Sequence, residues 1–588
     1  MKKELIFYII LFLFLLAFST TATNYDYDLW ARLIAGMGFV QTGHVLKQDF
    51  LSYTPTHTWF DHEWGSGVIF YLTQHFFSSA GLLILQAVLI FLIFFTITKV
   101  VQLRGVKTTS AYNFLFYYFA FISMSYMVDA PVRCQMFSFL FFAVFLYILE
   151  LSRKGNDKPL WLLPVLMLIW NNLHGGCVSG IGLIVMYIVG EFFNRKPIKK
   201  YIFPLIATIL VLPINPWGFE YIKFLITAST MPRPEVMEWW GLFSKYFMFK
   251  YMKFKIFALV MILVEFGVVI GEIISKKFYL RMRKNPKNDS FLRFFKSDLG
   301  SARTHNSCGI AGGMGASRTR ELARKIPNFS ASSFDKTKFL VLAVTMFLAI
   351  EHVKLIPFAV ISITCFLYDD FYTAFNFLTG NIFNKIGKRM RKNPKNEIPN
   401  FSASSKVKDA IIYCLILIFA FLNINANAFK PLLDWSRYPV LSVEFVRINE
   451  IKGNLLLSFG LGSYASYKLY PNNKIYMDGR YEEVYYDWTL PPLRKFYLAE
   501  NGWDEVLKNY PPDVMIIEKF YPIAGVLQKD KEWKAVFEDK FFIVFVNSEI
   551  AKKHYKKPSY DINYYKKTIF DTDINFMLQS KHGANKEN

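Results

Sequence analysis

Residues 81–102 read GLLILQAVLIFLIFFTITKVVQ, an apolar run long enough to cross a membrane as a helix. Runs of similar character recur along most of the chain, and several of them are short. They lie at about 5–22, 81–102, 112–128, 135–150, 160–173, 177–193, 201–214, 254–275, 337–350, 356–371 and 410–428. The sequence therefore predicts a polytopic α-helical membrane protein with about eleven transmembrane helices.

The composition supports this prediction. Of the 588 residues, 53% are hydrophobic and only 19% are charged, which is too apolar for a string of water-soluble domains. The formal net charge of +23 lies in short clusters between the apolar runs rather than along one face. This distribution is typical of a membrane protein that follows the positive-inside rule, so we expect no nucleic-acid partner.

The basic clusters also predict the orientation of the chain. Loops such as the one with Arg153 and Lys154, and the dense clusters at 276–338 and 385–408, alternate with loops that carry few basic residues. We therefore place the N-terminus in the cytoplasm and the tail from about 429 outside an inner (plasma) membrane. If two adjacent short spans were counted as one, every downstream loop would change sides and the basic clusters would lie outside. The alternation of basic loops therefore favours counting the short spans separately. A cleaved signal peptide at 5–22 is the alternative to a retained first helix.

This topology divides the chain into a membrane domain at 1–428, whose first external loop is 24–66, and an extracytoplasmic α/β domain at 429–588. Strands are expected at 455–459, 474–477, 514–517 and 541–546, and the basic end from Lys552 is expected to be loose. Two octapeptides occur twice, RMRKNPKN at 281–288 and 389–396 and IPNFSASS at 326–333 and 398–405. We interpret the segments at about 281–333 and 389–405 as tolerated cytoplasmic insertions, with a lipid-headgroup or regulatory site as the alternative.

Polar residues of unusual type gather on the predicted external side. The first external loop contains DYDLWAR at 26–32 and WFDHEW at 59–64, and later turns add NNLHGG at 171–176 and EHVK at 351–354. Solvated helix ends, an aromatic belt or turn chemistry would explain each motif alone. Ionisable groups near the membrane are costly and usually functional, so the one-sided cluster favours a site.

Other motifs are excluded or weak. His62-Glu63 lacks a second histidine, since Ser66 follows Gly65, and is therefore not a zinc-protease helix. The sequence GLGSYA at 460–465 matches a dinucleotide fingerprint in spacing, but a strand-to-helix turn is the preferred interpretation.

Five of these stretches carry a resemblance to a known family: DLW at 28–30, DFLSYT at 49–54, HEW at 62–64, NNLHGG at 171–176 and NPWG at 215–218. Together with an external tail, they resemble bacterial members of the GT-C glycosyltransferase superfamily, which includes protein mannosyltransferases. In such relatives the first motif tends to read DLWWH, whereas Ala31 and Arg32 occupy its last two positions here. The resemblance implies sugar transfer from a polyprenyl-phosphate donor at the outer face, and the departure leaves a lost or altered activity open.

The acids of the first external loop are then the catalytic candidates. Asp28 is the candidate general base because it belongs to the motif, with Asp26 second and Glu63 as a metal ligand or acceptor-positioning group. A divalent metal, Mg or Mn, is the candidate cofactor. The candidate substrate-binding residues are Arg133 and Lys354 as charges for the donor phosphate, His174 and His352 as hydrogen-bond donors, and His62 and Arg32.

The leading hypothesis is an inverting glycosyltransferase whose partners are a lipid-phosphate sugar, membrane lipid and an extracytoplasmic glycan or protein acceptor. A transporter or flippase of lipid-linked intermediates is the first alternative, and a non-catalytic membrane scaffold is the second. A transporter distributes functional polar groups along its spans to both sides of the membrane, whereas here they gather on one side.

Overall fold

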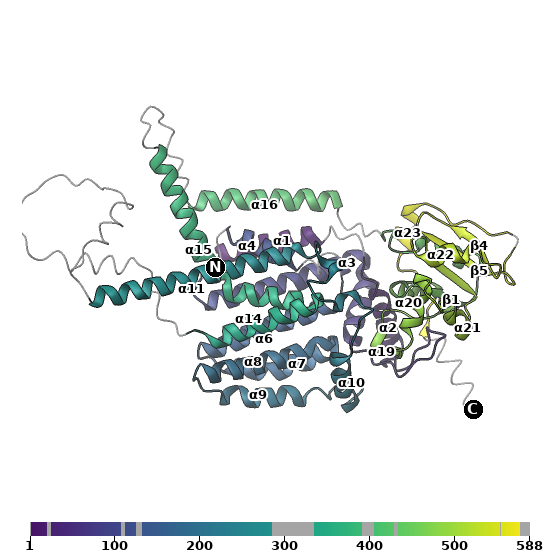
Figure 1. Cartoon of the computed structure of the whole chain (residues 1–588), viewed down its shortest axis with the longest axis horizontal. Coiled ribbons are helices and arrows are strands. Elements are labelled where there is room, and N and C mark those ends of the chain that lie inside the picture. Colours follow the sequence, from purple (N-terminus) through teal and green to yellow (C-terminus); the bar gives the residue numbers. More distant parts are fainter. Residues whose placement is uncertain are drawn as a thin grey trace, which may run out of the picture.

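The computed structural model describes residues 2–19, 25–106, 112–124, 132–284, 334–390, 405–427, 433–552 and 554–576. It is mostly helical, at 64%, and consists of a helical bundle and an α/β domain at one end of that bundle (Figure 1). Most of the two predicted insertions, 281–333 and 389–405, and the residues 129–131 lie outside the described residues.

The bundle is built from the N-terminal three quarters of the chain. Its helices are α1 (Lys2–Ser19), α2 (Leu29–Thr42), α3 (Trp64–Leu103), α4 (Tyr112–Ser123), α6 (Gln135–Arg153), α7 (Leu162–Leu173), α8 (Val178–Phe193), α9 (Lys199–Leu210), α10 (Phe219–Thr230), α11 (Met252–Lys284), α14 (Lys336–Glu351), α15 (Ile356–Met390) and α16 (Ser405–Asn427).

Each predicted apolar run lies mainly within one of these helices. By length and composition, four helical segments among the described residues are able to cross a membrane: Trp64–Leu103, Gln135–Arg153, Gly175–Phe193 and Val353–Tyr372. These apolar helices indicate a membrane protein, whereas the predicted number of spans remains a prediction.

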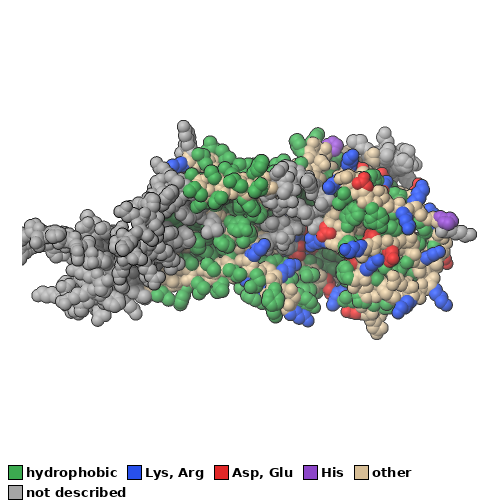
Figure 2. All heavy atoms as spheres, turned by 90° about the horizontal axis from the view of Figure 1, so that it is seen from above, with side chains coloured by type: hydrophobic (Ala, Val, Ile, Leu, Met, Phe, Trp, Pro, Cys, Tyr) green, Lys and Arg blue, Asp and Glu red, His purple; other side chains and the backbone are tan. Residues whose placement is uncertain are grey.

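The surface of the bundle agrees with that interpretation. Apolar side chains cover the helical part, while Lys, Arg, Asp and Glu are interspersed over the α/β domain (Figure 2). Phe203 and Leu210 on α9, and Phe421 on α16, each expose about two thirds of their surface, at 68%, 69% and 67%. Apolar patches of this kind on a soluble protein would be a liability, and lipid is the solvent that suits them.

Part of the predicted first external loop is helical. Helix α2 begins after Asp28, is apolar on most of its surface, and ends at Gly43, whose φ of 75° lets its N–H donate to the carbonyl of Phe39. The helix packs closely against the start of α3, because a Cβ on Gly36 would lie 2.1 Å from the carbonyl oxygen of Gly67. Helix α3 itself is interrupted at Ser78, which has φ 52°.

The α/β domain contains one sheet, formed by β1 (Gly453–Leu457), β2 (Asn473–Ile475), β3 (Val514–Glu518), β4 (Trp533–Glu538) and β5 (Phe542–Asn547) in the order β2-β1-β3-β5-β4. β1 is parallel to β2 and β3, and β5 is antiparallel to β3 and β4. The helices around it are α17 (Val440–Ile448), α18 (Gly462–Leu469), α19 (Tyr481–Val484), α20 (Leu490–Leu498), α21 (Glu505–Asn509), α22 (Pro522–Leu527) and α23 (Ile562–Thr568).

The first external loop joins the two parts of the molecule. The N–H of Tyr53 donates to the carbonyl of Ile475 at 3.0 Å, and the N–H of Ile475 donates to Leu51 at 2.9 Å. The loop therefore extends the sheet beyond β2. Beside it, Arg480 is fully buried and pairs with Asp49 at 2.7 Å and with Asp478 at 2.9 Å.

The expectation of a loose C-terminal end is wrong for residues 554–576. The hydroxyl of Tyr467 donates to the carbonyl of Phe570 at 2.8 Å. The N–H of Phe576 donates to the side chain of Gln41 on α2 at 2.9 Å, and the ring of Phe576 is buried. Aromatic side chains thus fix this basic segment, because their burial offsets the cost of ordering it.

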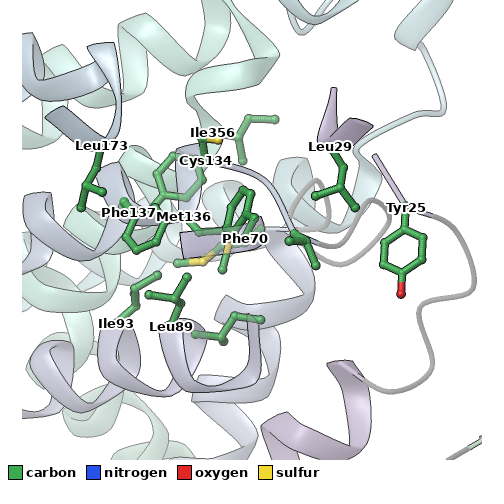
Figure 3. Packing of buried hydrophobic residues seen from close by; sticks show 14 of the residues in the cluster. Tyr25, Leu29, Phe70, Leu89, Ile93, Cys134, Met136, Phe137, Leu173 and Ile356 are labelled. Carbon is green, nitrogen blue, oxygen red and sulfur yellow. The ribbon is translucent and has the colours of Figure 1, made fainter. Parts of the chain in front are cut away.

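The apolar core continues up to the end of the bundle that meets the α/β domain. Phe70 from α3, Met136 and Phe137 from α6, and Ile356 from α15 belong to one buried cluster (Figure 3). These residues lie a few positions from Glu63, Arg133 and Lys354 in the sequence. The core therefore gives those polar side chains a rigid base.

Candidate functional site

The candidate residues come from five separate segments, all at the junction of the bundle and the α/β domain. Asp26 and Asp28 precede α2, Arg32 lies in its first turn, His62 and Glu63 precede α3, Arg133 precedes α6, His174 follows α7, and His352 and Lys354 lie between α14 and α15. Every one of them belongs to the described residues. They form two neighbouring charge clusters and one aromatic-basic group.

The first cluster surrounds Arg133 and contains Asp26, Asp28 and Glu238; we call it the Arg133 cluster. The guanidinium Nε of Arg133 lies 3.1 Å from Asp26, and its Nη2 lies 2.8 Å from Glu238 and 3.8 Å from Asp28. Three carboxyl groups thus share one buried cation. Burial raises the pKa of Glu238 well above its usual range, against the opposing charge of nearby Lys354.

Asp28 is the most exposed member of this cluster, since the side chain of Glu238 is 29% exposed. The side chain of Asp28 is 42% exposed, whereas those of Asp26 and Arg133 are 9% and 7% exposed. Desolvation and the negative charge of Asp26 raise the pKa of Asp28 to about 7, while Arg133 opposes the shift. Solvent at the exposed part keeps the group able to exchange protons. A carboxyl group with this pKa is suited to accept a proton at neutral pH.

The second cluster surrounds Arg32 and contains Asp61, Glu63 and Glu483; we call it the Arg32 cluster. Arg32 pairs with Asp61, with Glu63 at 3.3 Å and with Glu483 of the α/β domain at 2.8 Å. The indole N–H of Trp59 also donates to Glu483 at 3.1 Å. All four charged groups are buried, so Arg32 links α2, the first loop and the α/β domain.

Two histidines complete the Arg32 cluster. His62 Nδ1 lies 2.9 Å from Glu483, and although burial opposes protonation, the charges of Glu483 and Glu63 raise the pKa of His62 to about 9. His174 Nδ1 accepts the backbone N–H of Gly176 at 2.8 Å. Its proton must therefore lie on Nε2, which is 3.2 Å from Glu63. Burial lowers the pKa of His174, which favours this neutral form.

The sequence predicts Glu63 as a metal ligand or as a group that positions the acceptor. His62, Glu63 and His174 do each present a ligand atom within 4.8 Å of the others. A histidine binds a metal through an unprotonated nitrogen, so an ion at this position would have to displace the proton on His174 Nε2. Arg32 adds a positive charge 3.3 Å from Glu63. In this arrangement Glu63 is an ion-paired carboxylate, and a divalent metal at this position stays a prediction.

The third group surrounds Trp239, in the short turn Met237–Trp239. The guanidinium of Arg233 lies 4.3 Å and the ammonium of Lys354 lies 5.3 Å from the Trp239 ring. Arg233 is also paired with Glu482 at 2.8 Å. Among the described residues, no carboxylate lies within ion-pair distance of Lys354. Lys354 is therefore a cation whose charge no carboxylate among the described residues neutralises directly.

His352 lies against the same tryptophan. Its Nδ1 is 2.8 Å from the backbone carbonyl of Trp239, so this nitrogen carries a proton. Its Nε2 can donate a second hydrogen bond only when the ring is protonated.

The sequence predicts no role for several members of these clusters. Two of them have a local signal in the sequence, because Asp61 lies within WFDHEW at 59–64 and Glu238 precedes Trp239 and Trp240, so that charge is dense next to aromatic residues. Glu482, Glu483 and Arg233 had no such signal, because their partners are hundreds of residues away. Asp478-Gly479-Arg480, which follows β2, packs against the site, since a Cβ on Gly479 would lie 2.1 Å from Asp28 Oδ1.

The likeness of this chain to known proteins lies in its fold and is weak. No family model matches the sequence, and no curated protein matches it. Among solved structures, the fold is similar to the apo crystal structure of the Archaeoglobus fulgidus oligosaccharyltransferase, a GT-C enzyme. The TM-score is 0.44 at 9% identity, over 87% of this chain and 69% of that chain. A likeness of this strength is too weak to assign an activity.

Proposed function

We propose that the protein is a membrane glycosyltransferase that transfers a sugar from a polyprenyl-phosphate donor to an extracytoplasmic acceptor with inversion. One observation carries the proposal: a half-exposed carboxyl group, Asp28, lies beside the buried Arg133 at the end of an apolar bundle. Lys354, which has no carboxylate partner among the described residues, lies over Trp239, the neighbour of Glu238 in the same cluster. This pairing of a base with a separate cation suits a reaction that removes one proton and releases one phosphate.

Asp28 is the proposed general base. Its carboxylate takes the proton of the acceptor hydroxyl while that oxygen forms a bond to the anomeric carbon of the donor sugar. The bond between this carbon and the phosphate oxygen breaks, and the electron pair leaves with the phosphate. Attack from the face opposite the leaving group inverts the configuration at this carbon. Arg133 is the proposed positioning residue, because its contacts with Asp26, Asp28 and Glu238 fix the carboxyl groups.

Lys354 is the proposed contact for the leaving phosphate. A phosphate group needs charge stabilisation more than it needs a proton, and the ammonium of Lys354 is available for that role. His352 adds a donor when its ring is protonated. The sequence predicts His174 as a hydrogen-bond donor to the phosphate. It is better suited to orient Glu63, because both of its ring nitrogens already have partners.

The Arg32 cluster is proposed to hold the site together rather than to bind substrate. Arg32 stands where the related motif carries a different residue, and its ion pairs connect the first loop to Glu483. Glu63 and His62 support this connection. The departure from the family motif therefore has a structural explanation that is compatible with activity.

The proposed orientation follows the basic clusters of the sequence. The ends of α11 and α15 that lead into the basic segments lie away from the α/β domain (Figure 1). This arrangement supports a cytoplasmic location for those segments and an extracytoplasmic one for the α/β domain. The site would then face acceptors outside the cell.

The direct test of donor class is the lipid that the protein carries. We expect wild-type protein purified with its native lipids to contain a polyprenyl-phosphate sugar detectable by mass spectrometry. Lys354→Ala should retain much less of it, whereas the matched control Lys540→Ala, another lysine over an aromatic ring at 5.3 Å, should not differ from wild type. Absence of any such lipid from wild type, with transport of a lipid-linked intermediate in vesicles, would instead support a flippase.

A further inference from the structure

The α/β domain has a second polar position that the proposed reaction does not use. The chain passes from β1 to β2 on one side and then returns to β3 on the other side of β1, and both pairings are parallel. The carboxyl ends of β1 and β3 therefore meet at a topological switch point. In open α/β sheets, ligands bind outside the carboxyl ends of the strands at such a point.

A buried acid lies at this edge of the sheet. Glu518 is the last residue of β3, and its Oε1 accepts a hydrogen bond from Ser458, the residue after β1, at 2.6 Å. Its Oε2 is buried and has no hydrogen-bond partner among the described residues. The residue is only 8% exposed. An unpartnered buried carboxylate oxygen is costly, so it needs an explanation beyond packing.

A second unpartnered group lies near Glu518. The hydroxyl of Tyr497 is also buried and without a partner among the described residues. The N–H of Tyr521 donates to the backbone carbonyl of Glu518 at 3.1 Å, so Tyr521 lies directly beside this end of β3. The ring of Tyr497 packs on that of Tyr521 at a centroid distance of 4.7 Å. Tyr521 thus links the two residues that carry the orphaned polar groups, at the carboxyl end of β3.

This position adjoins the proposed reaction site. A Cβ on Gly460, in the turn after β1, would lie 3.5 Å from the ring of Tyr27. Gly479, which follows β2, packs against Asp28. The carboxyl ends of the three parallel strands therefore face the segment that carries the proposed base.

The two orphaned groups restrict the chemistry of the ligand. The carboxylate of Glu518 disfavours an anion, so a phosphate is a poor candidate. A hydroxyl group can donate to Glu518 and accept from Tyr497, whereas an ammonium group can only donate. Aromatic rings offer apolar faces to the C–H groups of a sugar ring. A neutral carbohydrate meets these requirements.

We infer that Glu518 and Tyr497 form a carbohydrate-binding subsite at the carboxyl edge of β3, and that the acceptor is a glycan rather than a protein. The first half of this inference concerns binding alone, and the second half rests on the proposed transfer reaction. The subsite holds the acceptor through its hydroxyl groups while the neighbouring Asp28 removes a proton.

The test measures binding separately from transfer. Full-length protein in detergent is applied to an array of immobilised neutral oligosaccharides as wild type, Glu518→Gln, Tyr497→Phe and Asp28→Asn. We expect wild type and Asp28→Asn to retain the same glycans. The binding signal of Glu518→Gln and of Tyr497→Phe should be at least about tenfold lower than that of wild type. The matched control is Glu538→Gln, whose carboxyl group lies on the surface of the same sheet and should have no effect.

The variants also report on folding. Glu518→Gln removes a charge from a buried position without a partner for Oε2, so its melting temperature should equal or exceed that of wild type. Wild type that retains no glycan, or Glu518→Gln that retains glycans as wild type does, would overturn the inference. Glycan binding by a protein that transfers no sugar would support the subsite while contradicting the proposed function.

Discussion

Arg32 shows how a single residue can connect parts of the molecule that are far apart in sequence. It stands at a position where the related motif differs, and the sequence alone offered an altered activity as the explanation. In the structure, Arg32 pairs with Asp61, Glu63 and Glu483, the last of which is 451 positions away. No local pattern in the sequence could have indicated the ion pair between Arg32 and Glu483. The high density of acidic residues in the first external loop, by contrast, can be read directly from the sequence.

Removal of the Arg32 side chain should therefore destabilise the protein strongly. Arg32→Ala leaves three buried carboxyl groups without their cation, and breaking a buried ion pair in this way typically costs about 3–5 kcal/mol. We expect a large fall in the melting temperature in detergent. Arg447→Ala, which breaks the more exposed pair with Glu444, is the matched control and should change it little. Equal melting temperatures for the two variants would contradict the structural role of Arg32.

His62 predicts a pH dependence of stability. Its folded pKa of about 9 lies above the ordinary value of 6.5, so the protonated ring stabilises the folded state. This contribution is fully present below about pH 6.5 and is lost as the pH rises through about 9. Protonation of His62 contributes up to about 3 kcal/mol to the free energy of unfolding. We expect the melting temperature to fall more steeply between pH 7 and 10 in wild type than in His62→Gln, and parallel curves would show that His62 is not protonated.

At the scale of elements, the sequence predicted the helices and most of the strands correctly. Each apolar run lies mainly within one helix, whereas four helical segments among the described residues are long and apolar enough to cross a membrane. β1, β2, β3 and β5 lie where short apolar stretches were found, but β4 was missed, since its sequence WKAVFE mixes charged and apolar residues on an edge strand. Helix α2 was also missed, because its residues were taken as part of a loop.

The contact between the turn after β2 and the first loop was not predictable, because it depends on the absence of a side chain at Gly479. Gly479→Ala places a Cβ where Asp28 Oδ1 now lies, so the carboxyl group must move. A displacement of about 1 Å at a reacting group can cost about 10²-fold in rate. We expect turnover to fall by that order with little change in melting temperature.

The matched control is Gly525→Ala, in the same domain, where an added Cβ meets no atom within 4 Å. This variant should keep wild-type turnover. If Gly479→Ala also does so, the α/β domain does not constrain the position of Asp28.

At the scale of the whole molecule, the candidate site lies where the membrane-facing bundle meets the α/β domain. The distribution of charge in the sequence predicted that functional residues would gather on one side, and the structure brings those residues together at one end of the bundle. It did not predict that the α/β domain supplies residues of its own, since pairings between segments hundreds of residues apart leave no periodic signal.

The predicted orientation can be tested by labelling single cysteines in intact cells with a membrane-impermeant reagent. Cysteines placed at Val45 and Glu500 should react from outside, whereas cysteines at Gly300 and Lys395 should react only after the cells are opened. This outcome follows from the basic clusters around the latter two positions. Labelling of position 300 from outside would reverse the orientation and remove the proposed access to extracytoplasmic acceptors.

The central claim is that Asp28 is the base in sugar transfer from a lipid phosphate. It is tested most directly by turnover of purified protein in liposomes that contain the lipid-linked sugar identified on it. We expect Asp28→Asn to lose about 10²- to 10⁴-fold in rate while it still inserts and binds the lipid, and the surface control Asp487→Asn to match wild type. Wild-type turnover in Asp28→Asn would contradict the mechanism.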